Sequence, residues 1–112
     1  MDIQHLDLLP AGLVEATCTG AEALSNDYGE SLVTYWKATA KTGESMENLR
    51  IYCKPIISPR SKLGRLLAAL DLPTEGLNTE KQIAKAVTGR SCALEVTYNE
   101  AGYVRLGLPE SG

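Results

Sequence analysis

Residues 32–54 decide the fold, and they read Leu-Val-Thr-Tyr-Trp-Lys-Ala-Thr-Ala (32–40), Lys-Thr-Gly-Glu-Ser-Met-Glu (41–47) and Asn-Leu-Arg-Ile-Tyr-Cys-Lys (48–54). The first and last of these segments predict two strands, with a turn at 41–45 between them. In the last segment the apolar residues 49, 51 and 53 alternate with Arg50, Tyr52 and Lys54. Because side chains in a strand point to opposite faces with period two, one face is apolar and the other has two cations with a tyrosine between them.

The chain before this pair predicts one more strand. Alternation of apolar and polar residues indicates a strand over 13–24, in which Gly20 breaks the pattern and marks a bulge. Residues 25–31 have the composition of a loop, so we expect a meander. Pro55 ends the third strand because proline cannot donate to a ladder.

The chain after this pair predicts helices and then two strands. Leucines at 63, 66, 67 and 70 have the spacing of one apolar helix face, with Ser58 or Ser61 as N-cap and a stop near Pro73. Gly64 in this helix allows close packing. Residues 79–88 predict a short second helix, and residues 92–98 and 103–108 predict two strands around a turn at 99–102.

The predicted order is therefore three strands, a helix, a second short helix and two strands. A five-stranded, partly open Greek-key barrel of this kind, with a helix between its third and fourth strands, is the OB-fold. We expect a mainly β protein with an inserted helix, forming one OB-type domain over residues 1–112. Residues 1–12 would be a poorly tied leader and 109–112 a short tail.

Charge is distributed unevenly along the 112 residues. The net charge is -3, but residues 33–65 have seven cations and two carboxylates, a net of +5, whereas residues 1–32 contain no lysine or arginine. Such an asymmetry favours a localised site for a polyanion. No apolar run approaches the ~18 residues that span a bilayer, and no signal pattern is present at the N-terminus, so we expect a cytoplasmic protein without membrane contact.

Catalysis, metal binding and cofactor binding are not expected. The chain lacks a phosphate-binding Gly-Lys-Ser/Thr loop, a Gly-x-Ser-x-Gly elbow and a His-Glu-x-x-His motif, and His5 is its single histidine. The three cysteines, Cys18, Cys53 and Cys92, are far apart and occupy apolar positions of predicted strands. They are interpreted as small buried hydrophobes and not as disulfides or ligands.

The chain also resembles the small phage and prophage proteins of recombination modules that have the OB-fold of single-stranded-DNA-binding proteins. The resemblance covers most of the sequence: Leu-Pro-Ala-Gly at 9–12 leading into Val-Glu-Ala-Thr, Tyr-Trp-Lys-Ala at 35–38, the helix at 61–72, Thr-Gly-Arg-Ser-Cys at 88–92 and Gly-Tyr-Val-Arg at 102–105. It implies a non-catalytic protein that binds single-stranded DNA, or RNA, during replication or recombination. Replication or recombination proteins would then be further partners.

Such binding needs cations for the phosphates and aromatic faces for the unpaired bases. The face of the second and third strands would supply them, with the nearby turn, the basic helix start and the last hairpin as secondary contacts. The candidate residues are Tyr35, Lys37, Arg50, Tyr52, Lys54, Lys41, Arg60, Lys62, Tyr98 and Tyr103.

Other interpretations remain open at this point. Tyr35 and Tyr52 could be a cross-strand pair on a solvated surface, Tyr98 and Tyr103 could close the barrel end, and Trp36, on the opposite phase, is expected in the core. For the whole protein, the alternative is a non-catalytic interaction or assembly module that forms a homo-oligomer or binds a phage or host protein. A barrel that binds a peptide or a small ligand is a third option.

Overall fold

The computed structural model describes residues 9–27 and 29–109, which contain five strands and two helices. They follow one another as β1 (Gly12–Asn26), β2 (Gly29–Thr39), β3 (Ser45–Cys53), α1 (Lys62–Ala69), α2 (Glu80–Val87), β4 (Ser91–Tyr98) and β5 (Val104–Gly107). The predicted order of elements is confirmed. Neither of these two helices is long and apolar enough to cross a membrane.

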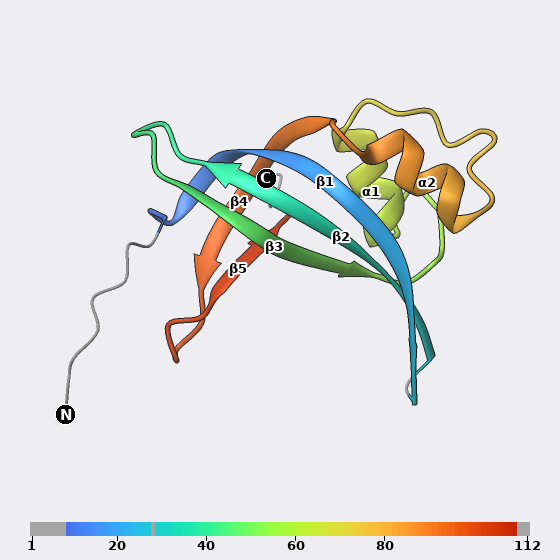
Figure 1. Cartoon of the computed structure of the whole chain (residues 1–112), viewed down its shortest axis with the longest axis horizontal. Coiled ribbons are helices and arrows are strands. Elements are labelled where there is room, and N and C mark those ends of the chain that lie inside the picture. The colour runs from blue at the N-terminus through green and yellow to red at the C-terminus, as the bar shows by residue number, and fades with distance from the viewer. Residues whose placement is uncertain (1–8, 28, 110–112) are drawn as a thin grey trace.

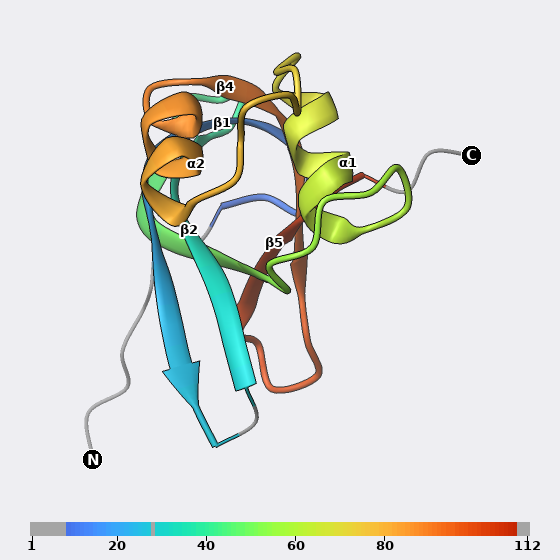
Figure 2. The ribbon, with the colours of Figure 1, turned by 90° about the vertical axis from the view of Figure 1, so that its right-hand side faces the viewer.

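The strands form one antiparallel sheet in the order β3-β2-β1-β4-β5. The sheet curls until its two end strands, β3 and β5, approach one another (Figure 1). The result is a nearly closed barrel of the OB type, as predicted. The helices lie together at one end of the barrel, beside the hairpin of β1 and β2 (Figure 2).

The core fills the inside of the barrel and the space beneath the helices. Leucines of α1 and the side chains of Ile83 and Val87 from α2 pack with the inward residues of the strands. Trp36 is completely buried among them, which confirms the prediction from its phase. Its indole Nε1–H donates to Thr34 Oγ1 at 2.7 Å, and the Thr34 hydroxyl donates to the carbonyl oxygen of Ile51 on β3 at 3.2 Å.

Two bulges bend the sheet. The register of β1 against β2 shifts between Cys18 and Gly20, at the bulge that the sequence predicts. The register of β2 against β3 shifts beside Lys37, where Asn48 adopts a left-handed φ of 62°. A bulge increases local twist, so both help the sheet to close on itself.

The prediction of a loop over residues 25–31 is wrong. β1 continues to Asn26 and β2 begins at Gly29, so the two strands form a long hairpin that projects beyond the barrel (Figures 1 and 2). Similarly, β3 begins three residues earlier than predicted, at Ser45. Small and polar residues suggested loops here, but pairing with a neighbouring strand outweighs their weak intrinsic preference.

The leader predicted over residues 1–12 is also only partly correct. Leu9 is 3% exposed and belongs to the core, and its carbonyl oxygen accepts a hydrogen bond from the Tyr98 hydroxyl. Strand pairing begins already at Gly12. Residues 1–8, with His5, and residues 110–112 of the predicted tail lie outside the described residues.

Helix α1 begins at a tight junction of two serines. Ser61 is the N-cap and accepts from the backbone N–H of Gly64 at 3.0 Å, while Ser58 and Ser61 exchange hydrogen bonds through their side chains. Gly64 is buried against this turn, and a Cβ added to it would lie 1.9 Å from the carbonyl oxygen of Ser58. The close packing expected at Gly64 is therefore confirmed.

Replacing Thr34 by valine should destabilise the protein by about 1–3 kcal/mol, because the near-isosteric side chain leaves the buried indole N–H of Trp36 without its acceptor. Urea denaturation followed by Trp36 fluorescence measures the change. Thr39→Val is the matched control, since Thr39 is exposed on the same strand, and it should change the free energy of unfolding by less than about 0.5 kcal/mol. Equal stability of the Thr34→Val protein and the wild type would contradict this account.

Replacing Gly64 by alanine should lower stability by about 1–3 kcal/mol, although alanine is the better helix former, because the Ser58 backbone must move. Thermal unfolding by circular dichroism is the measurement. Gly20→Ala serves as control, because nothing lies within 4 Å of a Cβ added there. A Gly64→Ala protein that unfolds at or above the wild-type temperature would rule out the contact.

Candidate nucleic-acid interface

The outer face of β2 and β3 presents four of the ten predicted binding residues together. Tyr35 pairs with Arg50, and Val33 pairs with Tyr52, so these side chains share the face opposite to Trp36. Lys37 follows Tyr35 on the same face and is exposed. The hairpin of β2 and β3 therefore brings Tyr35, Arg50 and Tyr52 onto one face, with Tyr35 directly opposite Arg50 and not opposite Tyr52.

Tyr35 is less available for stacking than the sequence suggests. Its partner on β1 is Gly20, which has no side chain, and the Tyr35 hydroxyl donates to Glu22 Oε1. The Arg50 guanidinium lies over the Tyr35 ring, 5.4 Å from its centroid, in a cation–π arrangement. The hydrogen bond to Glu22 raises the pKa of Tyr35, so the phenol stays protonated at neutral pH. One face of this ring is thus already occupied within the protein.

Carboxylates reduce the positive charge of this face. Glu22 reaches Tyr35 from β1, and Glu47 lies 3.7 Å from the Lys37 ammonium. In the sequence, Glu22 belongs to the acidic segment that precedes the basic one, and the register of β1 against β2 brings it beside Tyr35. Lys37 is therefore paired with Glu47, and Glu22 lies near Arg50, so the face around Tyr35 is less positive than its cations alone would make it.

A more positive surface lies where the barrel seam remains open. A groove of about 430 Å³ between β3 and β5 is lined by Arg50, Tyr52, Lys62 and Arg105, with apolar residues of both strands at its base. None of these lining residues, all within the described part of the chain, is acidic. The groove thus gathers three cations from β3, α1 and β5 around an exposed tyrosine.

These side chains come from three elements. Tyr52 lies on β3 with Arg50 and is 49% exposed, and its hydroxyl raises the pKa of the Arg50 guanidinium. Lys62 is the first residue of α1, directly after the Ser61 cap. Arg105 lies on β5 opposite Thr97, on the exposed face of the strand.

Arg105 was not among the residues singled out from the sequence. The signal was present, because Arg105 alternates with Val104 and Leu106 and so had to face outward. What the sequence does not reveal is that β5 comes to lie beside β3, which follows from barrel closure. Lys62, predicted only as part of a basic helix flank, gains its place in the groove for the same reason.

The remaining predicted residues are dispersed. Lys41 lies in the β2–β3 turn, Lys54 follows β3, and Arg60 precedes α1; all three are exposed and none lines the groove. Tyr98 is half-buried and bonded to Leu9, as expected of a residue that closes the barrel end. Tyr103, at 72% exposure in the β4–β5 loop, remains accessible to a ligand.

The cysteine and acidic side chains do not form a metal site in the part of the chain that the structure describes. Burial raises the pKa of Cys18, Cys53 and Cys92, in the last case to about 11, so these thiols stay protonated at neutral pH. Residues 9–27 and 29–109 contain no cluster of three or more histidine, cysteine or acidic side chains placed to share a metal ion. The groove offers charge and an aromatic face, which suit binding.

Comparison with known proteins adds no assignment to this geometry. No protein-family model, curated protein or solved structure matches the chain.

Proposed function

We propose that this protein is a non-catalytic, cytoplasmic binding protein for single-stranded nucleic acid, with single-stranded DNA as its ligand. The observation that supports this most directly is the groove between β3 and β5, where Arg50, Lys62 and Arg105 surround Tyr52 without a carboxylate among the lining residues that the structure describes. A site for such a ligand needs two features: cations along the path of the phosphate backbone, and aromatic rings that stack on the bases.

The barrel supports the same proposal. OB-folds bind oligonucleotides on the face of strands two and three and with the loops that join strands one to two and four to five. Here the β1–β2 hairpin and the β4–β5 loop, which contains Tyr103, project to the same side of the barrel at opposite ends of β3 (Figure 1). A nucleic-acid strand bound along the groove would run between the β1–β2 hairpin and the β4–β5 loop. The sequence resemblance to phage and prophage OB-fold proteins points to a role in replication or recombination.

An unpaired strand is favoured over a duplex by the aromatic residues. Tyr52 and Tyr103 are 49% and 72% exposed, and a ring can stack only on a base whose face is open. The face around Tyr35 and Lys37 also has two carboxylates, Glu22 and Glu47, and offers less attraction to phosphates. We therefore propose that the main contacts with the nucleic acid form in the groove between β3 and β5, and that Tyr35 and Lys37 lie at the edge of this site.

Binding to a fluorescein-labelled dT oligonucleotide should weaken as salt rises, with a slope of log K against log salt concentration of about -2, because three cations each release about 0.7 counterion from a single strand. Fluorescence anisotropy across a series of NaCl concentrations measures this slope. Arg105→Gln should make it shallower by about 0.7. Arg90→Gln, the same change at an exposed residue outside the groove, should leave it unaltered.

Replacing Tyr52 by alanine should cost about 1–3 kcal/mol of binding free energy through lost stacking. Tyr35→Phe should have little effect, since it keeps the ring and removes only the hydroxyl that bonds Glu22. If a folded wild-type protein fails to bind dT at low salt, or if Arg90→Gln and Arg105→Gln weaken binding equally, the groove is not the site. A parallel titration with oligo(U) separates DNA from RNA preference.

A further inference from the structure

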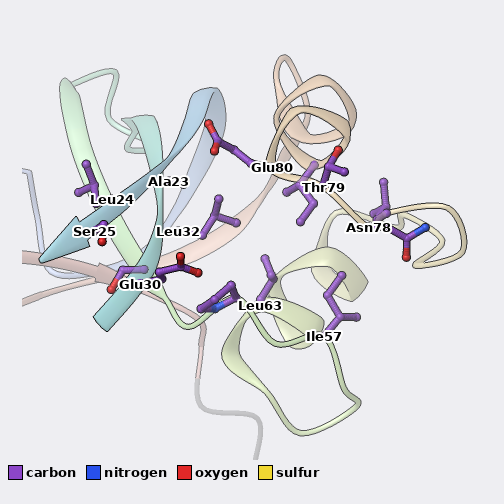
Figure 3. Close-up of a pocket in the computed structure, with 14 residues that line it drawn as sticks. Ala23, Leu24, Ser25, Glu30, Leu32, Ile57, Leu63, Asn78, Thr79 and Glu80 are labelled. Atoms are coloured by element: carbon purple, nitrogen blue, oxygen red, sulfur yellow. The ribbon is translucent and has the colours of Figure 1, made fainter. Parts of the chain in front are cut away.

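A second cavity shares no lining residue with the groove. It has a volume of about 360 Å³ and opens between the β1–β2 hairpin, the segment after β3 and the two helices (Figure 3). Leu32, Leu63, Ile83 and Leu77 supply apolar surface from four different segments. The volume is at the lower end of the range of about 300–1,000 Å³ that is usual for ligand sites. It can receive one or two apolar side chains.

The rim of this cavity is acidic. Glu30 on the hairpin and Glu80 at the start of α2 both line it, and Figure 3 places them on either side of Leu32. Both residues are exposed, and in the portion of the chain that the structure describes neither forms an ion pair. The residues lining the cavity, all of them described, include no lysine or arginine. An apolar group that enters here therefore meets a negative rim.

One side of the cavity is also an unpaired strand edge. β3 pairs with β2 only from Leu32 onward, where Leu32 faces Cys53, and Pro55 then turns the chain away. Within the described residues, Glu30 and Ser31 thus have β1 on one side and no strand on the other. Unpaired backbone groups of this kind accept an added strand through main-chain hydrogen bonds.

We propose that this cavity is a docking site for an extended segment of a partner protein in which a leucine-sized side chain is flanked by lysine or arginine. The apolar floor would take the side chain, Glu30 and Glu80 would face the flanking cations, and the edge at Ser31 would hold the backbone. A small molecule could use the floor but not the strand edge, so a peptide uses more of what the site offers. This site does not depend on the proposed nucleic-acid groove, which lies between β3 and β5.

The probe is the peptide acetyl-Lys-Leu-Lys-Leu-Lys-amide, titrated into the ¹⁵N-labelled full chain while backbone amide shifts are recorded. We expect saturable shifts at Glu30, Ser31, Leu63 and Ile83. Peptides with serine in place of leucine, or with glutamate in place of lysine, should produce no saturable shift at these positions. Absence of saturable shifts with the lysine–leucine peptide, or shifts centred elsewhere, would overturn the proposal.

Charge and volume variants test the two halves of the recognition separately. Glu30→Gln with Glu80→Gln should raise the peptide Kd about two- to thirtyfold, since two exposed ion pairs are lost and each contributes roughly 0.2–1 kcal/mol. Glu15→Gln with Glu100→Gln changes the net charge equally at exposed sites outside the cavity and should leave Kd unchanged. An equal loss in both double variants would show general attraction to an acidic protein and reject the site.

Ala23→Phe provides a variant without a change of charge. Ala23 is exposed and lines the cavity, so a ring at this position fills it. Peptide binding should fall at least tenfold, while binding of the dT oligonucleotide by the same protein should stay unchanged. Peptide binding that survives Ala23→Phe would exclude the cavity. Loss of dT binding in an otherwise folded Ala23→Phe protein would contradict the separation of the two sites.

Discussion

The hydrogen bonds between Trp36, Thr34 and Ile51 are the constraint on which the arrangement of this barrel depends. A buried indole N–H without an acceptor is costly, and here the acceptor, Thr34, is itself bonded to the backbone of β3. The two bonds therefore tie the side chain in the core to the register of β2 against β3. Since a slip by one residue would turn every side chain to the opposite face, this register also decides that Tyr35 and Tyr52 face outward.

Electrostatics divides the outside of the barrel into two unlike surfaces. On the face of β2 and β3, carboxylates from β1 and from the bulged part of β3 accompany Tyr35 and Lys37. At the groove between β3 and β5, residues from three elements contribute cations, and no acidic residue is among the described residues that line it. Sequence order therefore says little about local charge. The basic third of the chain supplies a face on which carboxylates also lie, and Arg105, outside that third, completes the positive groove.

Much of this fold follows from period-two alternation and from the leucine spacing of α1, because those patterns report burial, which every strand and helix must satisfy locally. The same reasoning places Trp36 inside and Arg50 outside. Contacts between distant segments cannot be predicted from these patterns. Glu22 contacts Tyr35 only because a bulge shifts the register of β1, and Arg105 reaches the groove only because the sheet curls into a barrel. The β1–β2 hairpin could not be predicted for another reason, because its polar residues are held in strands by pairing alone.

The open seam has a consequence for the protein without a ligand. The groove joins Arg50 of β3, Lys62 of α1 and Arg105 of β5, which are far apart in the sequence. It therefore exists only while these three elements are all in place, and local unfolding that detaches β5 removes it. An anion that contacts all three elements would stabilise the folded chain by mass action, with a gain that grows with the ratio of its concentration to Kd.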